Sequence, residues 1–192
     1  GEGDPDVYAG LPRPIFLSVG RVAVEKNIEA FLALDLPGSK VVVGDGPQRE
    51  DLEARYPDAI FRGARFDADL AAHFAGADVF VFPSLTDTFV ILEAMATGNP
   101  VAAYPAPGPI DIIPGSGAGV LALAATEGLR EACLEALKLD RGAVRRFAEG
   151  FSWRACAEDF VRNLQPWPEP EKTRFWRRLR RLTRLRQRRE DG

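Results

Sequence analysis

The fold follows from a stretch near the start of the chain, which reads Ile15-Phe-Leu-Ser-Val-Gly-Arg-Val-Ala-Val-Glu-Lys26. Its first five residues are mostly apolar, and such a run predicts a strand that is buried on both faces. Glycine ends the run, and the residues from Glu25 to Leu34 carry apolar side chains at helical spacing, which predicts a helix. A strand followed by a helix in this way starts a crossover unit, whose strands lie parallel.

The same alternation of apolar runs and helix-like segments continues along the chain. Further strands are predicted at 40–43, 59–61, 78–82, 100–104 and 119–121, and further helices at 47–56, 67–75, 90–97, 126–138, 141–149 and 152–164. We expect Asp67 to be the N-cap of the third helix and Gly98 to end the fourth. This alternation predicts an α/β fold, an open, doubly wound, Rossmann-like parallel sheet of five or six strands.

Composition divides the chain into a predicted linker at 1–14, a domain at 15–165, and a Pro-rich linker with a basic helix at 166–192. The net charge of −3 conceals this division. Residues 169–192 hold ten Lys and Arg against four Asp and Glu, a net of +6, and the other residues hold fifteen against twenty-four, a net of −9. An acidic body with a basic tail indicates two parts with different partners.

No apolar run approaches the roughly 18–20 residues that a membrane-spanning helix needs, and no signal segment opens the chain. Cys133 and Cys156 lie in predicted helices, and we expect two small buried thiols without a disulfide or a metal, as in a protein of the reducing cytoplasm. Because the chain begins at Gly1 and its only methionine is Met95, we expect a fragment or a processed or trimmed product.

Ligands of open parallel sheets bind just beyond the carboxyl ends of the strands, and two segments there suit a diphosphate. At Gly20, where the strand ends, no side chain obstructs the approach of a ligand to the backbone. Arg21 can bind two oxygens at once, and Lys26 adds a positive charge near the start of a helix. Bare backbone can also approach a ligand at the turn Gly44-Asp45-Gly46. The alternative for Arg21 and Lys26 is that they are solvated surface charges, and the alternative for the glycine turn is a tight turn without a ligand.

A further segment, at 105–111, is interpreted either as a stiff turn or as a ligand-facing loop.

A third segment, 83–93, is acidic. Asp87 lies in a loop, and Glu93 lies near the start of an otherwise apolar helix, where a buried carboxylate needs partners such as sugar hydroxyls. A turn residue is the alternative for Asp87, and compensation of the helix dipole is the alternative for Glu93. His73 lies on a helix beside Phe74, and we interpret it as a structural or surface residue rather than a base.

Four segments that match a known family pattern occur in this order along the chain: Ser18-Val-Gly-Arg-Val-Ala-Val-Glu-Lys-Asn27, Val43-Gly-Asp-Gly-Pro47, Asp78-Val-Phe-Val-Phe-Pro-Ser84 and Leu92-Glu-Ala-Met-Ala-Thr-Gly-Asn-Pro-Val101. Together they resemble family-4 retaining glycosyltransferases of the GT-B fold, and are similar to GDP-mannose-dependent α-mannosyltransferases. The resemblance implies the donor-binding half of an enzyme that moves a mannose-like hexose from a nucleoside-diphosphate sugar to an acceptor, with retention and without a cofactor or metal. The acceptor would bind an N-terminal domain that this chain lacks.

The resemblance also implies a role for each candidate residue. The groups are diphosphate-binding Gly20, Arg21, Lys26, Gly44, Asp45 and Gly46; base-binding Arg62, Gly63 and Ala64; donor-sugar-binding Asp87, Thr88 and Phe89; and ribose-binding Glu93. Asp87 and Glu93 are the implied catalytic residues. They lie six positions apart, about two fewer than in the family pattern, and two helical residues turn a side chain by about 200°. The shorter spacing therefore implies a changed contact between Asp87 and the donor sugar. For the whole chain, the alternative to a glycosyltransferase is a non-catalytic nucleotide-binding or membrane-tethered module.

Residues 174–189 predict a basic amphipathic helix. With about 100° of turn for each residue, one side carries Phe175, Trp176, Leu179, Leu182 and Leu185, and six of the nine arginines fall opposite. Such a helix can lie on an anionic membrane, at its inner face. Docking onto the body or onto the missing domain is the alternative. The acidic body argues against nucleic acid as a partner.

Overall fold

The computed structural model describes residues 7–85, 90–122 and 126–164. Asp87, Thr88 and Phe89, and the predicted basic helix at 174–189, lie outside these residues. The chain divides into two compact units, one that ends at Ser152 and one that begins at Trp153.

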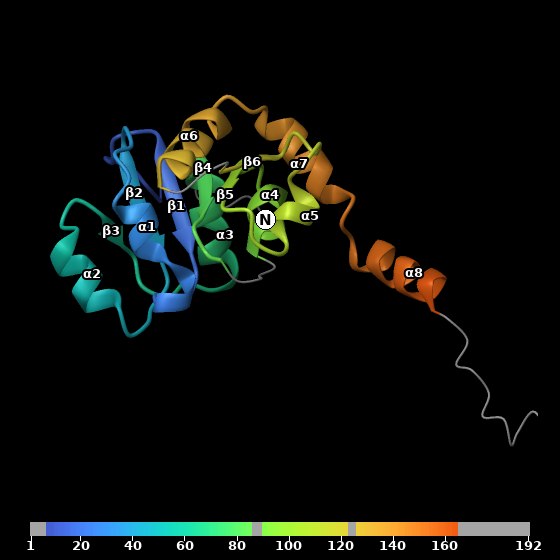
Figure 1. The fold of residues 1–192 in the computed structure, drawn as a ribbon, viewed down its shortest axis with the longest axis horizontal. Helices are drawn as coiled ribbons and strands as arrows, with labels where there is room; N and C mark the ends of the chain where they lie inside the picture. Colours follow the sequence, from blue (N-terminus) through green and yellow to red (C-terminus); the bar gives the residue numbers. More distant parts are fainter. Residues whose placement is uncertain (1–6, 86–89, 123–125, 165–192) are drawn as a thin grey trace, which may run out of the picture. The chain divides into compact units, whose positions relative to one another are not determined.

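Six parallel strands form one sheet in the order β3-β2-β1-β4-β5-β6 (Figure 1). The strands are β1 (Ile15–Val19), β2 (Ser39–Val43), β3 (Ile60–Phe61), β4 (Val79–Phe82), β5 (Val101–Ala103) and β6 (Gly119–Leu121). Leu17 of β1 lies level with Val41 of β2 on one side and with Phe80 of β4 on the other. The strand order reverses between β1 and β4, which is the switch point where ligands of such sheets bind. The predicted open parallel sheet is confirmed.

Eight α-helices occur in the described residues: α1 (Ile28–Leu32), α2 (Arg49–Arg55), α3 (Asp67–Gly76), α4 (Val90–Ala96), α5 (Pro109–Ile112), α6 (Thr126–Ala136), α7 (Arg141–Glu149) and α8 (Trp153–Asn163). The predicted helix at 25–34 is interrupted, because Asn27 has a left-handed φ of 51°. Asn27 separates the short 3-10 helix η1 (Val24–Lys26) from α1. Its Nδ2 donates instead to the carbonyl oxygen of Pro83, 3.2 Å away.

Two further predictions about helices are corrected. Asp67 is not the N-cap of α3: it is the first residue of the helix, and Phe66 stands at the N-cap without a capping side-chain hydrogen bond. Asp67 has a left-handed φ of 49°, which Asp tolerates better than most residues. The segment 105–111 contains the start of α5, because Pro109 fixes the first helical turn directly after Gly108.

Helices cover both faces of the sheet (Figure 1). Ile15 and Leu17 of β1 pack with α3, α4 and α7, whereas Phe16, between them, packs with α1, α2 and α6. Successive strand residues point to opposite faces, so each strand is buried twice. Two buried cores, one on each face, therefore hold the strand ends in a fixed arrangement.

The residues before β1 pack on the amino-terminal edge of the sheet. Tyr8 is buried, and its hydroxyl donates to the carbonyl oxygen of His73 at 3.1 Å. Arg13 pairs with Asp78 at 2.8 Å, and Asp78 also accepts from the backbone N–H of Ile15 at 2.7 Å. His73 is itself buried, and its Nδ1 lies 2.8 Å from the carbonyl oxygen of Asp69, so it supports the fold, as predicted.

Both cysteines are free thiols, and Cys133 is buried as expected. The expectation of a buried thiol is wrong for Cys156, which is exposed because α8 buries none of its residues. Burial raises the pKa of the Cys133 thiol to about 12. All residues of α8, in the second unit, have exposed or half-exposed side chains. Within the described residues, the helices are too short or too polar to cross a membrane.

Candidate functional site

The loops after β1, β2 and β3 are joined through their backbones. The N–H of Gly20 donates to the carbonyl oxygen of Val43 at 3.0 Å, and the N–H of Val22 donates to that of Asp45 at 2.9 Å. The N–H of Gly44 donates to the carbonyl oxygen of Gly63 at 2.9 Å. These hydrogen bonds continue the parallel pairing beyond the strands, so the three loops form one surface at the carboxyl edge of the sheet.

The glycines of these loops serve two different purposes. A Cβ on Gly44 would lie 1.8 Å from the carbonyl oxygen of Gly20, and one on Gly46 would lie 2.4 Å from that of Val22. Both glycines therefore let the second loop pack against the first. Gly20 has a φ of 149°, almost that of Gly44, but a Cβ there would meet nothing within 4 Å. Gly20 is thus the position where missing side-chain volume leaves room for a ligand.

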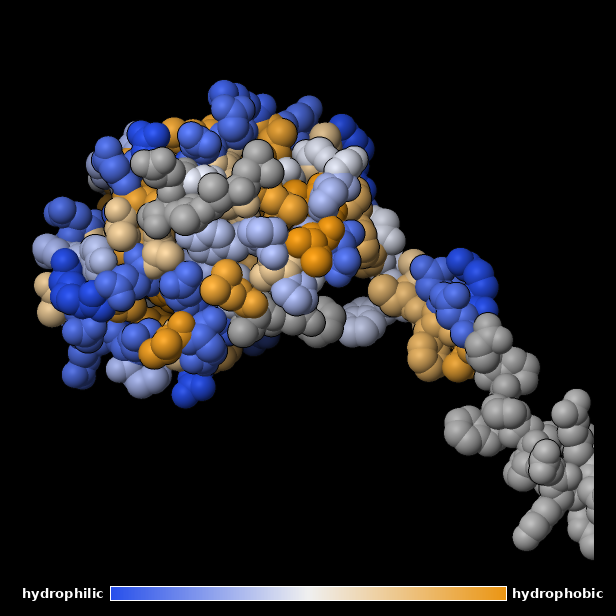
Figure 2. All heavy atoms as spheres, in the orientation of Figure 1, coloured by the Kyte–Doolittle hydropathy of each residue, from blue (hydrophilic) through white to orange (hydrophobic). Residues whose placement is uncertain are grey.

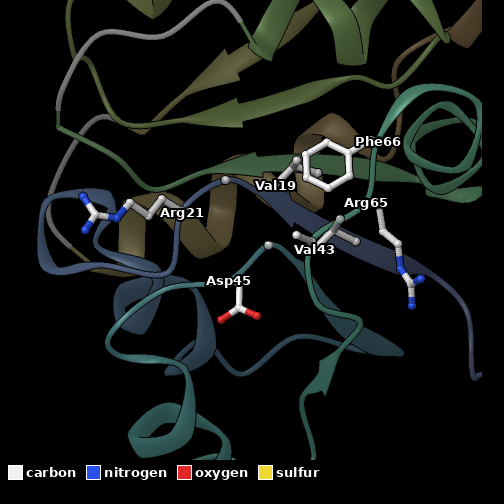
Figure 3. Close-up of a pocket in the computed structure, with 9 residues that line it drawn as sticks. Val19, Arg21, Val43, Asp45, Arg65 and Phe66 are labelled. Carbon is white, nitrogen blue, oxygen red and sulfur yellow. The ribbon is translucent and has the colours of Figure 1, made fainter.

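A cavity of about 270 Å³ opens between these loops (Figure 3). Nine residues line it: Val19, Gly20, Arg21, Val43, Gly44, Asp45, Ala64, Arg65 and Phe66. Five of them, Gly20, Arg21, Gly44, Asp45 and Ala64, are candidates from the sequence. Arg62 and Gly63 lie in the same loop but are not among the lining residues.

Arg65 and Phe66 line the cavity and were missed from the sequence. The signal that could have found them is their place directly after Ala64, in the same loop after β3. In Figure 3 the ring of Phe66 and the side chains of Val19 and Val43 gather at one end of the cavity, and Arg21 lies at the other end. Arg65 also lies at the Phe66 end, but its side chain extends away from the ring. The space beside the ring is therefore mainly apolar, and the opposite end is cationic.

Asp45 holds the second loop in shape. Its Oδ1 accepts from the backbone N–H of Gly46 at 2.7 Å, and its Oδ2 accepts from Nη1 of Arg49 at 3.2 Å. Arg49 also donates to Glu53 at 3.0 Å, and hydrogen bonds to Glu53 and Asp45 raise the pKa of Arg49. The Asp45 carboxylate is therefore engaged within the turn, which leaves the backbone of the turn to face a ligand.

Lys26 is the last residue of η1. The residues around it are tied to the loop after β4, since Ser84 Oγ donates to the carbonyl oxygen of Glu25 at 3.3 Å and Asn27 reaches Pro83. Lys26 is not among the residues that line the cavity. Arg21 is exposed and makes an ion pair of 3.6 Å with Glu25. Of the two predicted diphosphate-binding cations, Arg21 therefore lines the cavity and Lys26 does not.

Glu93 lies on α4, opposite the face of the helix that packs into the core. Ile91, Ala94 and Met95 are buried, whereas Glu93 is exposed. The expectation of a buried carboxylate is therefore wrong, because the helix turns this residue away from the core. An exposed carboxylate is free to accept from ligand hydroxyls. Its expected partners Asp87, Thr88 and Phe89 lie outside the described residues. In the described part of the chain, His, Cys, Asp and Glu form no cluster that could hold a metal ion.

Comparison with known proteins relates this fold to sugar-transferring enzymes. The chain is 36% identical over 170 residues to a sulfoquinovosyl transferase of Arabidopsis thaliana, which covers 80% of this chain and 33% of that protein. It is 42% identical over 113 residues to a GDP-mannose-dependent alpha-mannosyltransferase of Mycobacterium tuberculosis, which covers 57% of this chain and 30% of that protein. The chain thus spans about a third of the length of these relatives.

Solved structures share the fold. The lipopolysaccharide outer core galactosyltransferase WaaB superposes with a TM-score of 0.65 at 20% identity, over 80% of this chain and 49% of that one. The sucrose-phosphate synthase of Thermosynechococcus elongatus superposes with a TM-score of 0.64 at 28% identity, over 83% of this chain and 47% of that one. The sequence model of the glycosyl transferases group 1 family matches residues 13–139. The chain therefore belongs to the glycosyl transferases group 1 family.

Proposed function

We propose that this chain is the donor-binding half of a retaining glycosyltransferase that moves a mannose-like hexose from a nucleoside-diphosphate sugar to an acceptor. The observation that supports this most directly is the cavity shared by the loops after β1, β2 and β3, with Arg21 at one end. It lies at the carboxyl edge of a parallel sheet, where such folds bind nucleotides. Three relatives are named as GDP-mannose-dependent alpha-mannosyltransferases, which supports this donor.

In this proposal the chain acts by positioning and by charge. Arg21 and Lys26 bind the diphosphate and stabilise the negative charge that develops on it as the sugar leaves. The exposed Glu93 accepts from the ribose hydroxyls, and Asp87 contacts the donor sugar. We expect no metal to be needed, since two cations beside one diphosphate already neutralise much of its charge.

A second domain holds the acceptor in this proposal. Transfer requires the acceptor hydroxyl within roughly 3–3.5 Å of the reacting carbon, and the described residues provide one side of such a site. We therefore expect the chain to bind nucleotide but to transfer no sugar when tested without an acceptor-binding domain. Measurable transfer by the chain itself would contradict this division of labour.

Nucleotide binding is tested by calorimetry of the full chain with GDP, UDP and ADP. The double variant Arg21→Ala with Lys26→Ala should lower the affinity by about 100-fold or more, because each charge-assisted contact contributes about 1.5–3 kcal/mol. Arg145→Ala is the matched control: Arg145 is 63% exposed against 66% for Arg21, and both form an ion pair of 3.6 Å with a Glu four residues on. Absence of heat with all three nucleotides, on folded protein, would refute the proposal.

We further propose that residues 174–189 attach the protein to an anionic membrane, which favours a cytoplasmic enzyme acting at the membrane surface. This region has nine arginines, no acidic residue, and five large apolar residues at helical spacing. The full chain should sediment with vesicles that contain phosphatidylglycerol, but not with phosphatidylcholine vesicles, and a chain that ends at Leu164 should sediment with neither. Equal sedimentation of both chains would contradict the proposal, and release by salt would show the electrostatic part.

A further inference from the structure

We propose that Phe66 is the residue on which the nucleobase stacks, so that the donor is held by its ring at one end of the cavity and by its diphosphate at the other. This inference rests on the proposed nucleotide binding. It assigns a ligand contact to a residue that neither the sequence motifs nor the implied family roles include.

The exposure of Phe66 is the first observation. Its side chain is 72% exposed, whereas Phe16, Phe31 and Phe80 are fully buried in the two cores. Single exposed apolar residues are ordinary on protein surfaces, and Figure 2 shows several hydrophobic groups among hydrophilic ones. Phe66 differs because it is both exposed and part of the cavity lining. An aromatic ring in this place offers one free face to a flat ligand.

The chemistry around the ring is the second observation. Near the ring of Phe66, the aliphatic side chains of Val19 and Val43 line the cavity. The lining also includes the small side chain of Ala64 and the backbone of Gly20 and Gly44. A flat ring fits against such surfaces, whereas a phosphate would find no donor on the aliphatic side chains of Val19 and Val43. The base therefore belongs at this end, and the diphosphate belongs near Arg21.

Arg65, in the loop after β3, is directed to a residue of the helix that follows it. Its Nη1 lies 3.4 Å from Oδ2 of Asp69, in the first turn of α3, and in Figure 3 its side chain extends away from the ring of Phe66. Arg65 thus leaves the space beside the ring to the apolar residues. Stacking, rather than an ionic contact, is the interaction that this end of the cavity provides.

The backbone at the start of α3 is the third observation. Phe66 stands at the N-cap, where Ser, Thr, Asp or Asn would usually bind a free N–H group of the helix. It is extended, with φ of −138° and ψ of 159°, and the next residue, Asp67, is left-handed. Uncommon backbone at a loop that lines a cavity is typical of a functional position. The start of α3 therefore lacks a capping side-chain hydrogen bond, and the residue at the N-cap position places an aromatic ring at the cavity instead.

Recognition by stacking is tolerant of the base, because every base has a flat face. Phe66 should therefore set the affinity for nucleoside diphosphates as a class. Calorimetry of the full chain tests this with GDP, UDP, ADP and inorganic pyrophosphate. We expect Phe66→Ala to lower the affinity for each of the three nucleotides by about tenfold or more, and to leave the affinity for pyrophosphate unchanged. Phe66→Trp should restore the affinity, whereas Phe66→Leu, which is apolar but not aromatic, should not.

Two controls separate stacking from a general effect. Phe151→Ala removes another exposed phenylalanine of the same unit that is not among the cavity residues, and it should leave nucleotide affinity unchanged. In the Phe66→Trp variant, bound nucleotide should quench fluorescence beyond the quenching seen in the parent chain, since the new indole lies against the base.

The outcomes distinguish this inference from the proposed function. If the parent chain binds no nucleotide, the proposed function fails and the stacking role fails with it. If the parent binds and Phe66→Ala binds equally well, the stacking role alone is overturned. Equal loss of nucleotide and pyrophosphate binding in Phe66→Ala would also overturn it, since the change would then act on the phosphate end or on the fold.

Discussion

The loops after β1 and β2 and the loop after β4 lie at the same edge of the sheet, but they are held in different ways. The first two are joined by backbone hydrogen bonds and by glycines whose neighbours leave no room for a Cβ. The loop after β4 is held to η1 by the side chains of Asn27 and Ser84. Backbone contacts of the first kind restrict substitution, whereas side-chain contacts can be replaced. The spacing from Asp87 to Glu93, which is shorter than in the family pattern, occurs in the segment that follows β4, where side chains make the contacts.

This comparison assigns the two regions different parts of the donor. The loops after β1, β2 and β3 are the proposed site of base and diphosphate, and η1, which carries Lys26, is the part of this site that is tied to the loop after β4. The region around α4 is the proposed site of ribose and sugar. Nucleotide binding and sugar binding should therefore respond separately to mutation.

The largest effect is expected at Gly44. Gly44→Ala places a Cβ 1.8 Å from the carbonyl oxygen of Gly20, so the two loops must separate, and we expect a loss of about 3 kcal/mol or more in the free energy of unfolding. Gly20→Ala is the matched control, because its φ of 149° against 148° gives the same backbone strain without the clash. Urea denaturation of both variants gives the comparison, and equal destabilisation would show that loop contact contributes nothing.

An intermediate effect is expected from lengthening the loop after β4. Inserting Gly-Leu between Phe89 and Val90 should raise the affinity for GDP-mannose relative to GDP by about tenfold, the value of one good hydrogen bond. The reason is that the insertion restores the family distance between Asp87 and Glu93. The same insertion between Pro57 and Asp58, two exposed residues ahead of β3, is the control. An unchanged ratio of the two affinities would mean that the short loop already positions Asp87.

The smallest effect is expected at Asn27, where the two regions meet. Asn27→Gly keeps the left-handed backbone and removes the hydrogen bond to Pro83, so we expect a loss of about 1 kcal/mol in stability. Asn27→Ala should lose roughly 1 kcal/mol more, because a Cβ disfavours the left-handed conformation. Chemical denaturation measures both steps. If the Gly variant were as stable as the parent, this side chain would not fasten the loop after β4.

The sequence predicts best what depends on neighbouring residues. The apolar run at Ile15–Val19 and its counterparts identify all six strands, and the glycine turns identify the edge where ligands bind. Contacts between distant segments are not visible in this way. Asn27 breaks a helix in order to reach Pro83, which lies 56 positions away, so local periodicity predicts an unbroken helix.

The same limit applies to single residues of the candidate site. Glu93 was expected to be buried because its neighbours are apolar, but the helix faces it outward, a matter of rotation that depends on how α4 packs. Phe66 carries no motif, and only the shape of the cavity distinguishes it from the buried phenylalanines. Asp67 is of a residue type that is common at N-caps, but it lies one position after the N-cap of α3, which is Phe66.

The sheet ends in two very short strands, β3 with two residues and β6 with three. An outer strand exposes unpaired N–H and C=O groups, and a long one invites pairing with another molecule and aggregation. Outer strands this short offer an incoming chain too few partners for a stable ladder. The domain should consequently not associate with another copy through pairing of its outer strands.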